Sequence, residues 1–376
     1  MALRLEVADG IAQLPDDEWD ALVGDMPLLR HAFLSALEIS NSVGVGTGWQ
    51  PCPLLLYGDA QLIGAMPLFV KHHSYGEYVY DWAWAEAYES NGLSYYPKLV
   101  SAIPFTPITS ARLLTKSTDV KVLLINALSQ IMRQNKMSSA HVLFPDDDSA
   151  QSFKEAGWMQ RQGVQFRWRN QHYSDFEDFL SQLSHDKRKK IRQERKKVAA
   201  SGVVCRSIKG VEITAEQWDF FYQCYENTYF EHRSSPYLTR EFFQIIGKNM
   251  PQNILLMMAY LGEQPVAAAL NIYDKTTLYG RYWGSLQYVP NLHFELCYYQ
   301  AQAFCIAEKI EYFEGGAQGE HKLARGFKAR STCSFHKIEN PDFAVAIQEF
   351  VAQESKGLVA YTNELDERAP FRSKGN

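Results

Sequence analysis

The sequence repeats one pattern at a spacing of 203 residues, and this repeat limits the possible folds more than any single motif does. A strand–turn–strand pattern reads LLLYGDAQLIGAMPLFV in the first half and ILLMMAYLGEQPVAAALNIY in the second, with Gln264 in the place of Gln61. Two further pairs keep the spacing within one residue: Tyr75, Gly76 and Tyr78 with Tyr279, Gly280 and Tyr282, and Tyr95 and Tyr96 with Tyr298 and Tyr299. Agreement between three registers indicates a duplicated domain.

Each half carries signals for three adjacent strands, followed by a helix and a further strand. The predicted fold class is therefore α/β (α+β), with two tandem domains that are each a mixed, mostly antiparallel sheet flanked by helices. We place the first domain at residues 1–172, a basic connecting helix region at 173–202 and the second domain at 203–376. Residues 50–170 and 253–340 are expected to superimpose with the same strand order.

Positive charge is concentrated in one segment, HDKRKKIRQERKKV, from His185 to Val198. It holds eight lysines or arginines against two acidic residues, whereas the whole chain has a net charge of −5. As a helix it would place Arg188, Arg192 and Arg195 on one face. Such a face is either a platform for phosphates or a nucleic acid, because guanidinium groups match phosphate oxygens, or a solvated helix held by salt bridges.

Several classes of protein are excluded by what the sequence lacks. No apolar run approaches the ~20 residues of a membrane helix, and the first residues, MALRLEVADG, have neither part of a signal peptide. The six cysteines are scattered, without a CxxC pair or a histidine at metal-ligand spacing. We therefore expect a cytoplasmic protein with reduced thiols, no metal site and no membrane span.

The stretch EGGAQGEHKLARGF, residues 314 to 327, places four glycines and a burst of charge directly after KIEYF, a predicted buried strand. Glycines at the exit of a core strand suggest close approach of the backbone to a ligand. If a helix begins near Gly319, then His321, Arg325 and Lys328 share one face, beside exposed N–H groups. The predicted anion-binding residues are Gly316, Gln318, Gly319, Lys322, Arg325 and Lys328; the alternative is a glycine-rich surface turn with charges.

Carboxylates and aromatic side chains alternate in DWAWAEAYE, beyond the first-half strands. Asp81 and Glu86 beside Trp82 and Trp84 would suit a cationic amine or a sugar. The tryptophans fall on one face of an expected strand, however, and that pattern is equally typical of a core.

These segments carry a resemblance that covers nearly the whole chain. HAFLSALEISNSVGVGTGWQP, HSYGEYVYDWAWAEAYE, YYPKL, PFTPITSARLL, GRYWG, HFELCYYQA and GAQGEHKLARGF resemble the bacterial FemAB-like family of N-acyltransferases, described as peptidoglycan biosynthesis or recognition proteins. The resemblance implies a tandem GNAT fold. The related Fem transferases pass amino acids from aminoacyl-tRNA to the amino group of a peptidoglycan precursor.

The resemblance implies a transferase that moves an acyl or aminoacyl group to the amine of a small molecule or peptide, with no permanently bound cofactor. Neither half matches the Q/R-x-x-G-x-G/A loop that holds the pyrophosphate of acetyl-CoA in GNAT domains, because GSLQYVPNLHF and AEAYESNGLSYYP stand there. The donor is therefore aminoacyl-tRNA or acyl-CoA, and tRNA is a possible partner. The alternative is a non-catalytic binding module for peptidoglycan precursors or nucleotide-linked ligands.

Acyl transfer to an amine requires a group that removes a proton from the acceptor. The candidates are Glu314, Glu320 and His321, in and around the glycine-rich stretch. Tyr282, on the neighbouring predicted strand, could orient the substrate or return a proton, although tyrosines on such strands more often belong to the core. Arg325 is expected to pair with a phosphate or carboxylate of the substrate.

Overall fold

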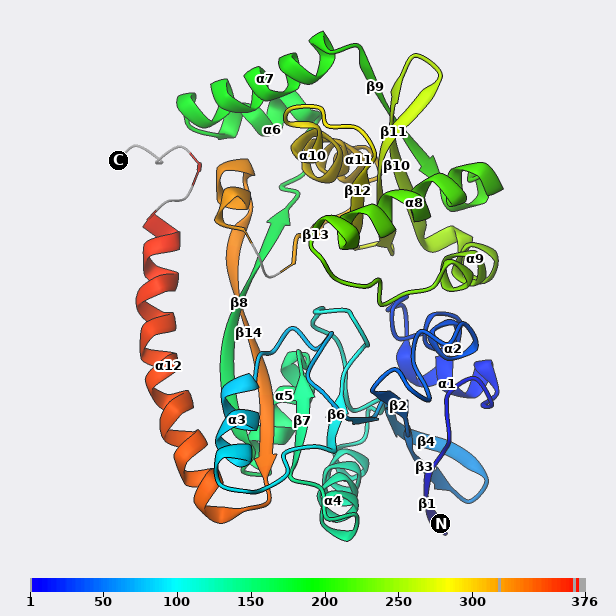
Figure 1. The fold of residues 1–376 in the computed structure, drawn as a ribbon, viewed down its shortest axis with the longest axis vertical. Helices are drawn as coiled ribbons and strands as arrows, with labels where there is room; N and C mark the ends of the chain where they lie inside the picture. The colour runs from blue at the N-terminus through cyan, green and yellow to red at the C-terminus, as the bar shows by residue number, and fades with distance from the viewer. Residues whose placement is uncertain (1, 317–318, 368–369, 372–376) are drawn as a thin grey trace. The chain divides into compact units, whose positions relative to one another are not determined.

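The computed structural model describes residues 2–316, 319–367 and 370–371, without the side chains of residues 320, 366 and 367. It contains two compact units, residues 1–163 with 331–360, and residues 164–330 with 361–376 (Figure 1). The chain passes from one unit to the other inside the strands β8 (Met159–Arg169) and β14 (Lys328–Ile338), and again inside the helix α12 (Pro341–Glu367).

The first unit has a small antiparallel sheet in the order β1-β3-β4, and a second run of strands in the order β2-β5-β6-β7-β14. Its strands are β1 (Leu3–Val7), β2 (Trp49–Pro51), β3 (Leu54–Gly58), β4 (Gln61–Met66), β5 (Phe69–Lys71), β6 (Lys98–Ser101) and β7 (Ser139–Leu143). Its helices are α1 (Asp16–Val23), α2 (His31–Ile39), α3 (Trp82–Ser90), α4 (Thr118–Gln134) and α5 (Asp147–Glu155). Strands β6 and β7 are parallel and are joined through α4.

The second unit has strands in the order β8-β13-β12-β11-β10-β9. The remaining strands are β9 (Val203–Lys209), β10 (Ile254–Leu261), β11 (Gln264–Tyr273), β12 (Thr277–Ser285) and β13 (Tyr312–Glu314). The α-helices are α6 (Phe176–Gln182), α7 (His185–Ala200), α8 (Ala215–Glu231), α9 (Arg240–Asn249), α10 (Leu292–Phe294) and α11 (Gln300–Ala307). Three 3₁₀ turns, η1 (Gly210–Glu212), η2 (Pro251–Asn253) and η4 (Glu320–Arg325), and one π-helical turn, η3 (Glu295–Tyr299), complete it.

Local sequence signals account for several helix starts. Thr214 and Gln217 form a capping box at the start of α8, in which each side chain accepts from the backbone N–H of the other residue. Ser117 caps α4, whose buried side has Val120, Leu124 and Leu128 at helical spacing. The amphipathic patterns that identify these helices therefore coincide with the faces that bury the core.

The first register of the sequence repeat is confirmed in detail. The antiparallel hairpin β3–β4 has a register shift between Leu56 and Tyr57, and the hairpin β10–β11 has one between Ala259 and Tyr260. Tyr57 and Tyr260 are separated by the same 203 residues as the repeat. A bulge conserved in position within both hairpins supports two copies of one unit.

The other two registers do not mark equivalent elements. Tyr75 to Tyr78 lie in a turn, whereas Tyr279 to Tyr282 lie on β12. Tyr95 and Tyr96 precede the strand β6, whereas Tyr298 and Tyr299 follow β12 in a helical turn. The equivalent parallel crossovers are β6–α4–β7 and β12–α11–β13, and the segment between the first hairpin and β6 is longer than its counterpart. Matching tyrosines alone therefore gave a wrong alignment of the two halves beyond the hairpins.

The strand that borders each crossover comes from the other half of the sequence. Strand β14 follows β13 in the chain but pairs antiparallel with β7, and β8 follows β7 but pairs antiparallel with β13. Residues 331–360, expected with the second half, therefore belong to the first unit, and the basic helix α7 belongs to the second. Within the described ranges, no helix combines the length and apolar character needed to cross a lipid bilayer.

Candidate functional site

The glycine-rich stretch leaves the second unit's sheet at Glu314, the last residue of β13. Strand β13 runs parallel to β12 and antiparallel to β8, so the stretch begins between two neighbouring strands. A Cβ at Gly315 would lie 2.7 Å from the Phe327 ring, and one at Gly319 would lie 2.3 Å from the His321 ring. The glycines thus make room for side chains of the protein itself, where the sequence had suggested a ligand.

A short 3₁₀ segment follows Gly319, rather than the longer helix expected from the sequence. The 3₁₀ turn η4 covers Glu320–Arg325, and Lys328 already lies on β14. His321 and Arg325 remain adjacent, because the Arg325 guanidinium donates to the His321 carbonyl oxygen at 2.7 Å. Gln318 and the side chain of Glu320 lie outside the described residues.

A tyrosine–histidine pair stands next to this turn. The Tyr298 hydroxyl lies 3.0 Å from Nε2 of His321. Tyr298 is part of the π-helical turn η3, and single π-turns recur at functional sites. Burial raises the pKa of Tyr298, so its hydroxyl stays protonated, whereas burial and the charges of Arg325 and Lys322 lower the pKa of His321. A protonated phenol therefore faces a neutral imidazole at neutral pH.

Lys322 and His293 add two further bases with lowered pKa values. Lys322 is buried, and its burial lowers the pKa to about 8. Burial, followed by the charges of His321 and Arg325, lowers the pKa of His293 to about 4. The rings of His293 and His321 are 6.3 Å apart. The site thus combines neutral imidazoles with an amine that loses its proton near physiological pH, as general base catalysis requires.

Arg325 has an internal partner in place of the expected substrate anion. Its side chain is buried, donates to Glu194 at 2.8 Å and lies 3.5 Å from the centre of the Phe294 ring. Glu194 also accepts a hydrogen bond from the Tyr299 hydroxyl. Arg325 therefore holds η4 against α7 and η3, and the acidic residue inside the basic segment is explained by this ion pair.

The arginines of α7 are likewise engaged within the second unit. Arg192 pairs with Glu177 of α6, Arg195 pairs with Glu295 of η3 at 3.2 Å, and Arg188 donates to the Ser181 carbonyl oxygen at 3.4 Å. The helix itself is confirmed over His185–Ala200. Its exposed positive charge is carried by the lysines instead, among them Lys189, Lys190, Lys196 and Lys197.

The remaining predicted residues have other partners than the Tyr298–His321 pair. Glu314 accepts hydrogen bonds from Arg167 and Arg330. Tyr282 packs against the rings of Tyr225 and Phe243, 5.2 and 5.8 Å between centres, and lies in an aromatic cluster with α8 and α9. The Gly316 carbonyl oxygen accepts from the Phe166 amide. The sequence analysis missed Tyr298 and His293, and missed Lys322 as a base, because their grouping joins separate segments of the sequence and no pattern within one segment links them.

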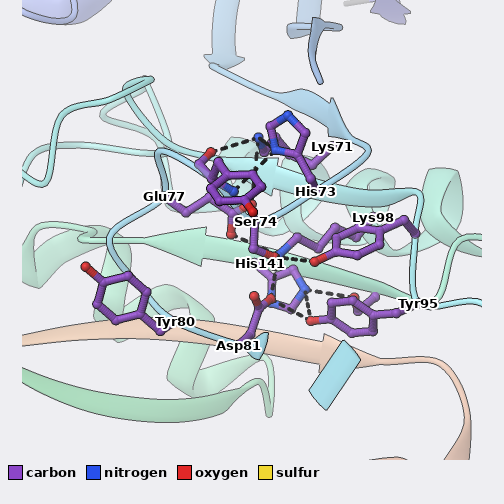
Figure 2. A network of polar contacts seen from close by, with 12 residues as sticks. Lys71, His73, Ser74, Glu77, Tyr80, Asp81, Tyr95, Lys98 and His141 are labelled. Atoms are coloured by element: carbon purple, nitrogen blue, oxygen red, sulfur yellow. Dashed lines mark hydrogen bonds and ion pairs between the residues drawn. The ribbon is translucent and has the colours of Figure 1, made fainter. Parts of the chain in front are cut away.

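A second cluster of ionisable groups lies in the first unit. Figure 2 shows its side chains turned toward one another. Lys98, fully buried on β6, donates to Ser74 at 2.8 Å, to Glu77 at 2.9 Å and to Asp81. Burial alone would lower the pKa of Lys98, but the two carboxylates raise it. Lys98 is thus a buried cation held by two buried acids.

This buried network extends at both ends. Burial lowers the pKa of Lys71 to about 7 and raises that of Glu77 to about 7, and their charged atoms are 3.9 Å apart. At the other end, the Tyr95 hydroxyl donates to Asp81 at 2.7 Å and lies 3.3 Å from His141. The network therefore ties the segment from β5 to α3 to strands β6 and β7.

From the sequence, only Asp81 of this network was proposed as a ligand contact, and Tyr95 was named only as part of the repeat. The expected strand around it is the helix α3, in which Trp84 is buried and Trp82 is 40% exposed, so the two tryptophans do not share a face. The lysines were missed because a lysine usually marks an exposed position. The available signal was Lys98 directly before an apolar run, shortly after Glu77 and Asp81.

Two buried histidines of the first unit make its stability depend on pH. Nδ1 of His141 and Nδ1 of His336 are 2.6 Å apart, and burial lowers the pKa of His336 to about 3 and that of His141 well below its ordinary value. Unfolded histidines bind protons below about pH 6.5, which the folded ones do not. The two histidines should therefore lower the stability as pH falls from about 6.5 toward 3, His336 by about 2 kcal/mol at pH 5, whereas protonation of Glu77, whose pKa is raised to about 7, opposes part of this loss.

Urea unfolding at pH 7 and pH 5 measures this loss. Between the two pH values, the variant His336→Gln should lose about 2 kcal/mol less stability than the unmodified protein, whatever its stability at pH 7. His185, whose side chain is 76% exposed, provides the control, and His185→Gln should keep the full difference. An unchanged pH difference in His336→Gln would show that other groups cause the acid sensitivity.

Comparisons with known proteins agree on the fold and the family. The model of the FemAB-like family, described as peptidoglycan biosynthesis/recognition, matches residues 10–373. The crystal structure of FemX superimposes with a TM-score of 0.56 at 11% identity, covering 93% of this chain and 100% of that one. L-PGS from Bacillus licheniformis gives a TM-score of 0.54 at 10% identity, over 90% of this chain and 97% of that one. No curated protein matches the sequence.

The predicted fold class is confirmed: a mixed α/β structure with a mixed sheet flanked by helices, which the duplicated sequence indicated, of the tandem GNAT type that the resemblance implied. The likeness to solved structures at such low identity concerns the fold alone, whereas the family match extends over nearly the whole length. The chain belongs to the FemAB-like family of peptidoglycan biosynthesis and recognition proteins.

Proposed function

We propose that the protein is a transferase that moves an acyl or aminoacyl group to the amine of a small molecule or peptide, such as a peptidoglycan precursor. One observation carries the proposal: the Tyr298 hydroxyl, which stays protonated, lies 3.0 Å from the neutral imidazole of His321, and the next residue in the chain, Lys322, has a pKa lowered to about 8. Amide formation needs groups that accept and donate protons, since one proton must leave the attacking amine and another must reach the leaving group.

The steps follow from the protonation states. The Lys322 amine removes a proton from the ammonium group of the acceptor, and the resulting neutral amine attacks the carbonyl carbon of the donor. The new C–N bond gives a tetrahedral intermediate, which collapses as the C–O bond of an aminoacyl ester or the C–S bond of a thioester breaks. The Tyr298 hydroxyl donates its proton to the leaving oxygen or sulfur, and the amine nitrogen gives up its second proton to His321, which passes it to Tyr298.

The donor we propose is aminoacyl-tRNA or acyl-CoA. The family description supports an acceptor related to peptidoglycan, and the sequence lacks the usual acetyl-CoA loop. A binding module for such precursors would keep the fold but would not require an amine base with a lowered pKa next to a phenol–imidazole pair.

The test is a transfer assay with both donor classes. The purified protein is incubated with a UDP-linked peptidoglycan pentapeptide and either aminoacylated total tRNA or acetyl-CoA, and mass spectrometry detects the amide product. We expect a product whose mass increase identifies the donor, and its absence from the Lys322→Met variant. Binding of the pentapeptide without a product from either donor would favour the binding module and contradict the transferase.

A further inference from the structure

A pocket of about 370 Å³ opens on the second unit and is separate from the Tyr298–His321 pair. Its wall comprises Arg167, Arg169, Gln171, Tyr312, Gly326, Lys328, Ala329, Arg330 and Phe371. Successive residues of a strand point to opposite faces, so the cationic side chains of β8 and Tyr312 of β13 share one face, while Trp168 and Phe313 point into the core. The pocket is therefore built on the open face of the β8–β13 pair.

The wall carries more positive than negative charge. Four cations contribute, namely Arg167, Arg169, Lys328 and Arg330. Two carboxylates oppose them: Glu314 pairs with Arg167 and Arg330, and Glu311 pairs with Arg169 at 3.0 Å. Among the described side chains, the balance leaves an excess of two positive charges around a cavity of small-molecule size.

The buried Glu314 fixes two of the guanidinium groups. A single oxygen, Oε1, accepts from Nε and Nη2 of Arg167 and from Nη1 of Arg330 at 3.1 Å. The other oxygen, Oε2, is buried and has no hydrogen-bond partner among the described residues. Both arginines are thus positioned by one carboxylate oxygen while Nη1 of Arg167 and Nη2 of Arg330 are not used in that contact.

Aromatic rings support the cations from the sides. The guanidinium groups of Arg167 and Arg169 lie 4.7 and 5.8 Å from the centre of the Tyr312 ring, and the Lys328 ammonium lies 5.3 Å from that of Phe371. These contacts reduce the freedom of long side chains before any ligand arrives. They also give the pocket two apolar surfaces beside its positive charge.

We infer that this pocket binds a phosphate group, either inorganic or as part of a nucleoside diphosphate. A phosphate dianion neutralises the excess of two charges, and its tetrahedral oxygens can take donors from several directions, as the guanidinium groups and the ammonium provide. The aromatic surfaces favour a ligand that carries a flat ring next to the phosphates. The inference concerns binding alone and does not depend on the transfer chemistry proposed above.

Isothermal titration calorimetry at low salt tests the pocket with pyrophosphate, ADP and UDP, and with malonate, a dianion that carries two carboxylates in place of phosphate groups. We expect pyrophosphate to bind at least about tenfold more tightly than malonate, because the pocket's donors converge from several directions. Tighter binding of ADP or UDP than of pyrophosphate assigns the pocket to a nucleotide; equal or weaker binding assigns it to the free phosphate group.

The double variant Arg169→Gln with Lys328→Gln removes two charges from exposed side chains and should leave the fold intact. It should weaken pyrophosphate binding by about tenfold or more and reduce its dependence on salt. Arg330→Lys keeps the positive charge but loses the paired N–H donors of the guanidinium group. It should weaken pyrophosphate binding less than Arg330→Gln does.

The matched control is Lys196→Gln, which removes an exposed cation from the basic helix α7 of the same unit. It should leave pyrophosphate affinity unchanged. Undetectable pyrophosphate binding, malonate binding as tight as pyrophosphate, or a loss in Lys196→Gln that equals the loss in the double variant would each overturn the inference, whether or not the protein shows transferase activity.

Discussion

Replacement of Lys322 by methionine should lower kcat by about a thousandfold, within the range expected for loss of a general base. The reason is the environment of Lys322: its burial lowers the pKa to about 8, so a useful fraction of the amine is neutral at physiological pH. The base must be deprotonated to act, so kcat/KM of the unmodified enzyme should rise with pH through about 8. Steady-state kinetics between pH 6 and 9 would show this rise in kcat/KM, and the Lys322→Met variant should lack it.

The variant Lys322→Arg separates catalysis from charge. Arginine keeps a cation at this position but does not release its proton at any pH used here. If Lys322 acts as the base, Lys322→Arg should be as impaired as Lys322→Met. Recovery of activity in Lys322→Arg would show that the residue serves as a binding cation and would exclude it as the base.

The Tyr298–His321 pair should contribute separately. Tyr298→Phe removes the hydroxyl that lies 3.0 Å from His321, and His321→Ala removes its partner. Each should lower kcat by about a hundredfold with a smaller change in KM, since both act on proton transfer. The double variant should lower kcat by about as much as either single variant, because the two residues form one proton path. Full turnover in both single variants would exclude the pair from catalysis.

Replacement of Lys98 by methionine should destabilise the first unit by about 3–5 kcal/mol, because two buried acids would lose their shared cation. Lys98 is fully buried, and Glu77 and Asp81 are 4% and 2% exposed. Water cannot compensate for the lost ammonium at such a position. Urea unfolding at pH 7 measures the change as a lower midpoint with a similar slope.

A matched control is available in the same unit. Lys121 is also buried, but its partner Asp148 is 70% exposed. Lys121→Met should therefore cost no more than about 1 kcal/mol. Adding Glu77→Gln and Asp81→Asn to Lys98→Met should restore part of the lost stability, because the uncompensated charges disappear. Equal destabilisation at positions 98 and 121 would contradict a special role for the buried network.

The sequence could predict those elements whose signal is local. The helix His185–Ala200, the capping box of α8 and the strand before the glycines depend on neighbouring residues, and the two bulged hairpins keep their spacing because both halves retain the same register. The tyrosine matches failed since aromatic residues recur in strands, turns and helices alike.

The candidate site could be predicted only in part, because its contacts join distant segments. His321 was identified from its charged surroundings, but its partner Tyr298 depends on how the π-turn η3 packs. Arg325 has its partner Glu194 on another helix, 131 residues earlier in the chain. Lys98 becomes a buried cation only when segments around residues 74–81 fold over β6. No periodicity within one segment encodes such pairings.

The exchange of β8 and β14 has a consequence for how the protein is made. Strand β7 ends at Leu143, yet its neighbour β14 begins at Lys328, so about 185 further residues must be synthesised before that neighbour exists. At roughly 5–20 residues per second, a ribosome needs about 10 to 40 seconds for this interval. During that time, one edge of β7 lacks its native neighbour and can pair with other chains. The exchanged strands therefore place the period of greatest aggregation risk during translation, and slow codons between residues 143 and 328 should lengthen it.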